Sequence, residues 1–201
     1  MPCGIDTERF RALDRNKARN FLRVEHDSLL FLHVGNFSAD KNYIFLLQLF
    51  LEILSRRSKA QLLLVGDGKL RREIESLGNS LGLNDHARFL GFRTDIPELL
   101  KAADALLLPS ILEGFPIVAV EAQFAQIPVV ASTRVTREID LFGNVLFLDL
   151  EAGPAAWAEK ILEFLAQPRT WPPLSDPRYR PLTIDENVRL LREIYGQALA
   201  P

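Results

Sequence analysis

The sequence predicts an α/β fold in which one parallel sheet of about six strands carries helices on both faces. Six short apolar runs, each bounded by turn residues, alternate along the chain with longer helical patterns. The runs show no alternation of apolar and polar positions, which is typical of strands that are covered on both faces. A repeated strand–helix order of this kind predicts a Rossmann-like, doubly wound layout.

The elements follow one another regularly over the first 167 residues. Apolar runs predict strands at 29–34, 61–65, 88–90, 105–108, 128–131 and 145–148. Apolar residues at helical spacing predict helices at 42–57, 69–82, 96–103, 116–125 and 155–167. Loops that leave the carboxyl ends of parallel strands meet at one edge of the sheet, so we expect any ligand to bind there.

The end of the chain departs from this pattern. Five of the twelve prolines fall within residues 168–183, which we expect to be a non-helical linker that runs extended across the surface. Beyond it, apolar residues at helical spacing predict an amphipathic closing helix over 184–201. The chain thus divides into a sheet domain over 1–167, a linker and a helix.

Composition excludes several classes of protein. Lys and Arg number 24 against 26 Asp and Glu in 201 residues, so the chain lacks the positive field on which nucleic-acid binding depends. One cysteine, Cys3, and three scattered histidines provide neither an internal disulfide nor a structural zinc site, which favours a reducing, cytoplasmic environment. We expect no signal peptide, and the apolar stretch 44–54 is shorter than the roughly 20 residues of a membrane span.

Glu121 is a candidate functional residue, because it is the only charged residue between Glu113 and Arg134. On a helix that begins near Pro116 it shares a face with apolar residues, so we expect its carboxylate to lie in a poorly solvated cleft. A buried charge is costly unless hydrogen-bond donors surround it. The residues alone leave two sources of donors open: the two hydroxyls of a nucleotide ribose, or the protein's own backbone and arginines.

The start of the same helix is a candidate site for an anion or a sugar hydroxyl. Gly114 allows a sharp turn and Pro116 suits the first helical position, so backbone N–H groups would be exposed beside Glu113. The partial charge of a helix end does not neutralise a diphosphate, so a cation is also needed. Lys41, in the loop after the first strand, is a candidate; the alternative is an ordinary solvated lysine at a helix start.

Several motifs share one order with a known family. They are Pro2-Cys3-Gly4-Ile5-Asp6, Val65-Gly66-Asp67-Gly68, Phe89-Leu90-Gly91-Phe92, Pro109-Ser110 and Pro128-Val129-Val130-Ala131-Ser132. The most specific motif is the pair Glu113 and Glu121, two glutamates separated by seven residues. Over nearly its whole length, the chain resembles the C-terminal, donor-binding domain of retaining GT-B glycosyltransferases, the family-four group that builds capsular polysaccharides and exopolysaccharides.

The resemblance implies a role for each candidate residue. Glu121 would hold the ribose of a nucleotide-sugar donor, Glu113 would contact the sugar, and Lys41 would stabilise the charge that builds on the departing diphosphate. Arg93 would border the base. The full implied donor site is Gly35, Asn36, Lys41, Arg93, Glu113, Gly114, Phe115, Pro116, Ile117 and Glu121, with Lys41 and Glu113 as the catalytic residues.

The resemblance also implies the substrate and partners. The donor would be a UDP-sugar, and no metal or other cofactor is expected because the chain has no Asp-x-Asp pair. The chain has the size of one of the two Rossmann-like domains of a GT-B hexosyltransferase, so transfer would need an N-terminal acceptor domain in cis or in trans. Any peripheral membrane association would come through that domain.

One departure from the family leaves other functions open. The family usually has an arginine directly after the glycine that opens the first loop, where this chain has Asn36; Arg134 or Arg137 would have to replace that cation. A non-catalytic binding or scaffold module, in which Asn36 marks lost donor chemistry, is therefore an alternative. A GT-B sugar-nucleotide epimerase is a further one, although its catalytic acids and histidine are not apparent.

Overall fold

The computed structural model, which describes residues 4–198 and side chains through residue 195, confirms the expected α/β fold. Its six strands are all parallel and lie in the order β3-β2-β1-β4-β5-β6. They are β1 Leu30–Val34, β2 Gln61–Val65, β3 Ala87–Gly91, β4 Ala105–Leu108, β5 Val129–Ser132 and β6 Val145–Leu148. The strand order reverses between β1 and β4, the point at which doubly wound sheets bind ligands. Cys3 and residues 199–201 of the expected closing helix lie outside the described residues.

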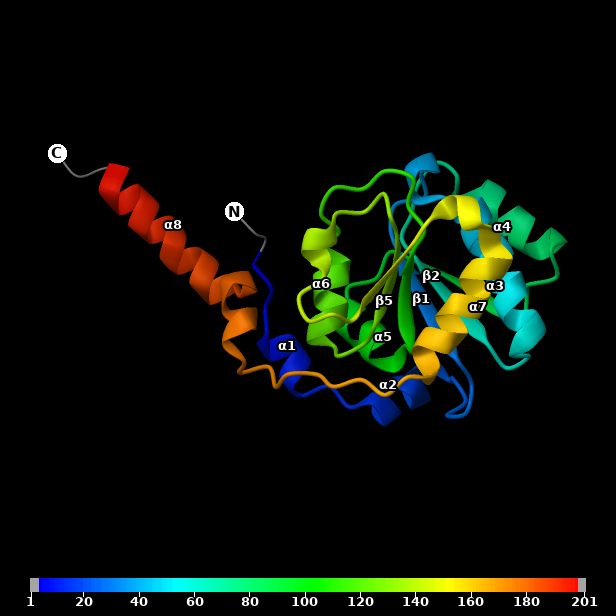
Figure 1. Ribbon diagram of the computed structural model, residues 1–201, viewed down its shortest axis with the longest axis horizontal. Coiled ribbons are helices and arrows are strands. Elements are labelled where there is room, and N and C mark those ends of the chain that lie inside the picture. Colours follow the sequence, from blue (N-terminus) through cyan, green and yellow to red (C-terminus); the bar gives the residue numbers. More distant parts are fainter. Residues whose placement is uncertain (1–3, 199–201) are drawn as a thin grey trace.

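Helices cover both faces of the sheet (Figure 1). One face carries α3 Tyr43–Arg56, α4 Arg71–Ser80 and α7 Gly153–Ala166, and the other carries α5 Ile96–Ala102 and α6 Ile117–Phe124. Three short 3₁₀ helices are η1 Ala39–Lys41, η2 Arg137–Ile139 and η3 Leu150–Ala152. Leu30 and Leu32 of β1 enter one hydrophobic core and Phe31 enters the other, because successive side chains of a strand point to opposite faces. The expected bounds of these strands and α-helices are correct to within two residues.

Two helices near the N-terminus were not expected from the sequence. They are α1 Glu8–Arg11 and α2 Arg15–Leu22. The helix α2 buries only Arg19 and Leu22, so it shows too few apolar positions for a helical period to stand out. Its one clear signal is Asp14, whose side chain accepts a hydrogen bond of 2.8 Å from the backbone of Lys17 and caps the helix.

Arg19 of α2 fastens the N-terminal segment to the sheet. Its side chain is almost fully buried and donates to the carbonyls of Ser28 at 2.6 Å and Ala102 at 3.0 Å. It also pairs with Asp104 at 3.3 Å, and the same carboxylate oxygen accepts the backbone N–H of Leu30 at 2.7 Å. One buried arginine therefore satisfies polar groups at the starts of both β1 and β4.

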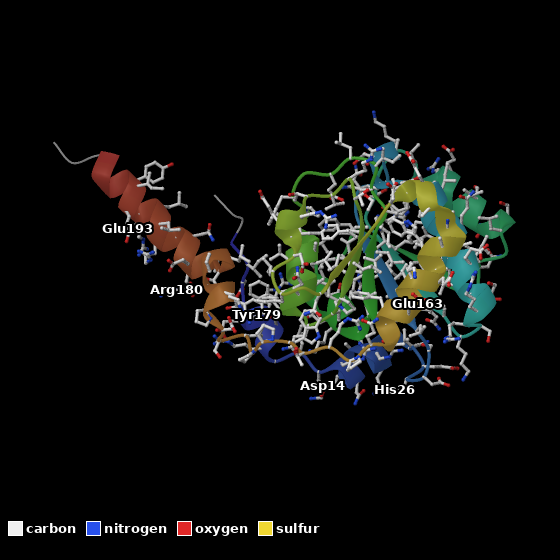
Figure 2. All side chains as sticks on the ribbon, viewed as in Figure 1. Asp14, His26, Glu163, Tyr179, Arg180 and Glu193 are labelled. Atoms are coloured by element: carbon white, nitrogen blue, oxygen red, sulfur yellow. The ribbon has the colours of Figure 1, made fainter. Side chains whose placement is uncertain are left out.

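The expectation of an extended linker is wrong over Pro177–Leu182, which forms the 3₁₀ helix η4. Pro177 suits the first helical position and Asp176 caps the turn, so proline here begins a helix instead of preventing one. Tyr179 is buried at this turn, with its ring centre 4.5 Å from that of Phe124 and its hydroxyl donating to the Gln123 carbonyl at 3.2 Å (Figure 2). The segment is thus anchored on α6.

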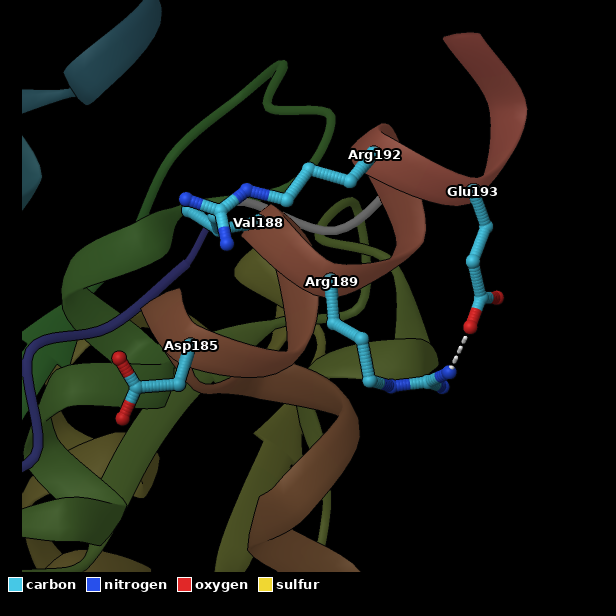
Figure 3. Close-up of a pocket in the computed structure, with 5 residues that line it drawn as sticks. All are labelled: Asp185, Val188, Arg189, Arg192 and Glu193. Carbon is cyan, nitrogen blue, oxygen red and sulfur yellow. Dashed lines mark hydrogen bonds and ion pairs between the residues drawn. The ribbon is translucent and has the colours of Figure 1, made fainter. Parts of the chain in front are cut away.

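The last helix, α8 Ile184–Ala198, projects away from the sheet (Figure 1). Its first residue donates its backbone N–H to Ile5 at 2.9 Å, next to an isolated β-bridge between Ile5 and Thr183. A furrow of about 560 Å³ follows the helix (Figure 3). It is lined by Asp185, Val188, Arg189, Arg192 and Glu193, and Arg189 pairs with Glu193. All five residues belong to α8 itself, so the furrow is not part of the sheet edge at which a ligand is expected.

Arg19→Ala should lower the free energy of unfolding by about 3 kcal/mol, because it leaves the buried carbonyls of Ser28 and Ala102 without their arginine donor and removes one of the two arginines that pair with Asp104. Urea unfolding followed by circular dichroism measures the change. Lys160→Ala, which removes an exposed pair with Glu163, is the control and should leave stability unchanged. Equal effects of the two substitutions would contradict the structural role of Arg19.

Candidate functional site

The loops that follow β1 and β2 interlock at the carboxyl edge of the sheet. Gly66 has φ +135°, and a Cβ placed on it would lie 1.9 Å from the carbonyl oxygen of Gly35. Gly68 has φ +154°, and its Cβ would lie 2.5 Å from the Oδ1 atom of Asn36. Only glycine permits both the conformation and the close approach. The backbone of residues 35 and 36 is therefore packed closely against the loop after β2.

Lys41 and Glu113, which the sequence predicts to be the catalytic pair, lie together at this edge. The Lys41 Nζ atom is 2.5 Å from Oε1 of Glu113, and the hydroxyl of Ser110 donates to Oε2 at 2.7 Å. Both charged side chains are largely buried, at 17% and 12% exposure. A backbone hydrogen bond of 2.7 Å from Ile111 to Asp40 also joins the two loops. The pair thus links the loop after β1 with the loop after β4.

His33 lies beneath this pair and was missed by the sequence analysis. It is fully buried in β1, and its Nδ1 atom donates to the Leu107 carbonyl at 2.7 Å. Burial lowers the pKa of His33 to about 4, so the ring is neutral and Nε2 is an acceptor; no described residue donates to it. A Cβ on Gly35 would lie 3.2 Å from this Nε2 and 3.5 Å from the Lys41 side chain. The sequence signal that could have found it is a single histidine within an otherwise apolar strand.

Glu121 lies on α6, three residues before Phe124. Its side chain is half-buried, and this burial raises the pKa of the Glu121 carboxyl. The positive charge of Arg9 opposes part of that rise. Among residues 4–195 no side-chain or backbone group donates a hydrogen bond to its carboxylate. The poorly solvated environment expected from the sequence is therefore present, and it contains no hydrogen-bond donor from the described chain.

The loop between β4 and α6 differs in detail from the sequence-based expectation. Pro116 caps α6 and the first helical residue is Ile117, one position later than expected. Gly114 has no positive φ, and nothing in the described chain lies within 4 Å of the Cβ that it lacks. The backbone conformation and the surroundings at this position therefore do not make use of the freedom that glycine allows. Phe115 and Ile117 are 38% and 41% exposed, so this loop presents an open face.

A pocket of about 400 Å³ lies between the loops that follow β1, β2 and β3. Its lining includes Gly35, Asn36, Gly66, Asp67, Phe92 and Arg93. Arg93 is held by two hydrogen bonds to the carboxylate of Asp95, at 2.7 and 2.5 Å. Phe92 is 81% exposed, an unusual state for so large an apolar side chain. Arg93, Asn36 and Gly35 of the expected site thus meet in one pocket.

The two arginines considered as replacements for the missing cation lie in the segment after β5, which contacts the Glu113 loop through an isolated β-bridge between Val135 and Glu113. The guanidinium of Arg137 lies 4.8 Å from the centre of the Phe147 ring. Arg134 is exposed, and over the described part of the chain its guanidinium makes no ion pair. The same residues contain no group of three or more His, Cys, Asp or Glu side chains able to hold a metal ion. They also contain no helix with the length and apolarity needed to cross a membrane.

Comparison with known proteins identifies the family. The sequence profile described as "Glycosyl transferases group 1" matches residues 14–175. This chain belongs to the glycosyl transferases group 1 family. It is 37% identical over 174 residues to the putative glycosyltransferase EpsF of Bacillus subtilis, covering 84% of this chain and 45% of EpsF. It is 30% identical over 137 residues to the Escherichia coli UDP-Gal:alpha-D-GlcNAc-diphosphoundecaprenol alpha-1,3-galactosyltransferase, covering 66% of this chain and 35% of that enzyme.

Solved structures of group 1 transferases and related proteins share the fold. Sucrose-phosphate synthase from Thermosynechococcus elongatus matches with a TM-score of 0.80 and 25% identity, over 98% of this chain and 51% of its own. Anabaena HepE, in complex with UDP and glucose, matches with a TM-score of 0.75 and 21% identity, over 96% of this chain and 55% of HepE. The C-terminal domain of LpcC from Francisella tularensis matches with a TM-score of 0.69 and 18% identity, over 94% of this chain and 98% of that domain. The α/β sheet is thus that of GT-B glycosyltransferases, and the chain spans about half the length of sucrose-phosphate synthase, HepE and EpsF.

Glu121→Gln should stabilise the ligand-free chain at pH 7 but not at pH 4. Burial raises the pKa of Glu121 above its usual 4.5. Between the pKa of the unfolded chain and that of the folded chain, the folded chain binds more protons, so its stability falls as the pH rises through this range. Glutamine removes this penalty. Urea unfolding at both pH values measures the effect, with the exposed Glu138→Gln as control. The same gain at pH 4 and pH 7 would contradict a desolvated carboxylate.

Proposed function

We propose that this chain is the donor-binding domain of a retaining glycosyltransferase that builds exopolysaccharide or capsular polysaccharide from a UDP-hexose. The observation that carries the proposal is Glu121: a half-buried carboxylate with no donor from the described chain, on the helix that follows the Glu113 loop. A carboxylate that is costly to the empty protein is accounted for when a ligand supplies its donors.

A ribose diol suits Glu121 in its chemistry. Two adjacent hydroxyls donate to the two oxygens of one carboxylate, and each charge-assisted bond contributes about 1.5 to 3 kcal/mol. A phosphate would not suit it, because two anions would repel each other in a poorly solvated place. Glu121 would thus bind the ribose of a nucleotide, and the phosphates would lie against the loop after β1.

Lys41 would act on the diphosphate. As the bond between the sugar and the diphosphate breaks, negative charge builds on the departing oxygen, and a fixed cation lowers the barrier. The Lys41 ammonium has three N–H donors, so its bond to Glu113 leaves donors for a phosphate oxygen. Glu113 holds the lysine in place, and its own carboxylate is oriented by Ser110.

The remaining predicted residues would receive the two ends of the donor. The open space beside Gly114, with Phe115, Pro116 and Ile117, would admit the sugar, and Glu113 would accept hydrogen bonds from its hydroxyls. The pocket with Arg93 and the exposed Phe92 would take the base. The closely packed backbone at Gly35 and Asn36 would lie under the diphosphate.

The comparisons support this proposal through the names of similar proteins. HepE has been crystallised with UDP and with UDP-glucose, and the LpcC structure that the chain matches along almost its whole length is a C-terminal domain. We accordingly propose that transfer requires an N-terminal acceptor domain, in cis or in trans, and that the isolated chain is inactive. A cytoplasmic location, peripheral membrane association through that other domain, and transfer without a metal or other cofactor belong to the same proposal.

A non-catalytic binding module is the second candidate, and Asn36 favours it. Arg137, one of the two candidate replacements for the family's arginine, has its guanidinium 4.8 Å from the centre of the Phe147 ring, and this contact favours a chain that lacks the second cation for a diphosphate. A module of this kind would bind UDP weakly or not at all. Nucleotide affinity therefore separates the two candidates.

Calorimetric titration with UDP, GDP and ADP tests the proposal, and we expect binding that is tightest for UDP. Glu121→Ala should reduce the UDP affinity by about 1.5 to 4 kcal/mol, because the ribose loses its acceptor. Glu138→Ala, on the exposed helix η2, is the matched control and should bind as the wild type does. A folded chain that binds none of the three nucleotides would overturn the donor-binding role.

Lys41→Met should weaken UDP binding by about 1 to 3 kcal/mol while leaving uridine binding unchanged, because uridine lacks the diphosphate that the lysine contacts. Glu121→Ala, in contrast, should weaken both ligands, since both carry the ribose. The two titrations together separate the roles of the two residues. A loss of uridine affinity in Lys41→Met equal to the loss for UDP would assign the lysine to another part of the ligand.

A further inference from the structure

Lys41 lies in a short loop between β1 and α3. The loop begins at Gly35, directly after β1, and ends at Tyr43, the first residue of α3. Lys41 is the last residue of η1, and Asn42 after it has φ +58°, a left-handed conformation that ends this turn. The Lys41 side chain passes beside Gly35, because the Cβ that Gly35 lacks would lie 3.5 Å from Lys41 Cγ and Cδ. The place of the ammonium therefore depends on how the two ends of the loop are held.

Tyr43 joins these two ends by a hydrogen bond. Its hydroxyl donates to the carbonyl oxygen of Gly35 at 2.9 Å. Tyr43 is buried, and this burial, together with the negative charges of Asp40 and Glu113, raises the pKa of its phenol. The hydroxyl thus keeps its proton and remains a donor. The bond ties the start of the loop to its end, with Lys41 between them.

Two neighbouring rings fix the ring of Tyr43. Phe37 is stacked on it, with ring centres 4.2 Å apart and planes inclined by 11°. His33 meets it edge-on, with ring centres 4.8 Å apart, and is itself bonded to the Leu107 carbonyl of β4. All three rings are buried, so Tyr43 cannot change its rotamer without displacing one of the others. The hydroxyl is therefore held at Gly35.

Contacts with the loop after β4 hold Lys41 from the other side. The backbone N–H of Ile111 donates to the Asp40 carbonyl at 2.7 Å, and the Lys41 ammonium pairs with Glu113. A phosphate oxygen would compete with Glu113 for the same ammonium. The lysine then needs a support that the ligand does not disturb, and the bond from Tyr43 to Gly35 involves neither the ammonium nor Glu113.

We propose that Tyr43 is a positioning residue for diphosphate binding: its hydroxyl, bonded to the Gly35 carbonyl, closes the loop after β1 and holds the Lys41 ammonium where a phosphate oxygen can meet it. The inference rests on the proposed function, because it assigns the diphosphate to Lys41. It adds a residue from the start of α3 that is not among the site residues expected from the sequence. Tyr43 acts through Lys41 and touches no reacting atom.

The test is a calorimetric titration of the full chain with UDP and with uridine. Tyr43→Phe keeps the stacked rings and removes only the hydroxyl, so it should weaken UDP binding by about three- to tenfold, the effect of one hydrogen bond. Uridine binding should be unchanged, because uridine has no diphosphate. In a Lys41→Met background, Tyr43→Phe should have no further effect on UDP affinity. Independent, additive losses in the double variant would contradict a role through Lys41.

Tyr179→Phe is the matched control. It also removes a buried hydroxyl that donates to a carbonyl, that of Gln123 at 3.2 Å, but away from the loop after β1. Both variants should lose a similar free energy of unfolding in urea, whereas only Tyr43→Phe should lose UDP affinity. Equal losses of UDP affinity in the two variants would show an effect of stability alone and would overturn the inference.

A second readout needs no ligand. Hydrogen exchange of the Ile111 amide, which is bonded to Asp40, should be at least about threefold faster in Tyr43→Phe, because the Lys41 loop opens more often. The Leu30 amide, bonded to Asp104 at the opposite end of the strands, should exchange as in the wild type. Wild-type UDP affinity in Tyr43→Phe would overturn the inference. If the wild type binds no nucleotide, the proposed function fails, and the exchange at Ile111 alone decides whether Tyr43 holds this loop.

Discussion

Burial of the sheet on both faces leaves its two edges as the places where polar side chains gather. The central strands β1, β4 and β5 are almost entirely buried, and the helices that cover them fill two separate cores. A side chain in these layers can be polar only if a partner is at hand. The loops at the carboxyl ends of the strands are free of this requirement, and they converge at the point where the strand order reverses. The candidate site lies there for that reason.

Three buried or half-buried charges illustrate different uses of this environment. The two terminal nitrogens of Arg19 donate to carbonyls and to Asp104, and the residue serves stability. Lys41 is paired with Glu113 but keeps donors unused, so a pair that is stable without ligand can also bind one. Glu121 has no donor in the described chain, and it lowers stability when ionised. Only the last arrangement is difficult to explain without a ligand, which is why the functional proposal depends on it.

The loops around the pocket pack closely on one another and are joined by backbone hydrogen bonds without a ligand. Glycines at 66 and 68 allow the second loop to touch the first, and a buried, neutral His33 supports Gly35 from below. Such pre-organisation reduces the ordering cost of binding and places backbone groups at fixed positions under a ligand. The close packing of the loops also involves Asn36, whose side chain lies against Gly68. This short side chain fits between the two loops at the position where the family resemblance leads us to expect an arginine.

Apolar periodicity and motif spacing are local properties of the chain, so the sequence predicts the six strands, the five main helices and Glu113, Glu121 and Lys41 as candidate site residues. The folded structure shows that Lys41 pairs with a glutamate 72 residues away and that His33 lies beneath this pair. It also revealed α2, whose buried side is an arginine rather than an apolar stripe, and the helical turn within the proline-rich segment. These features depend on contacts between residues far apart in the chain, and such contacts leave no periodic signal in the sequence.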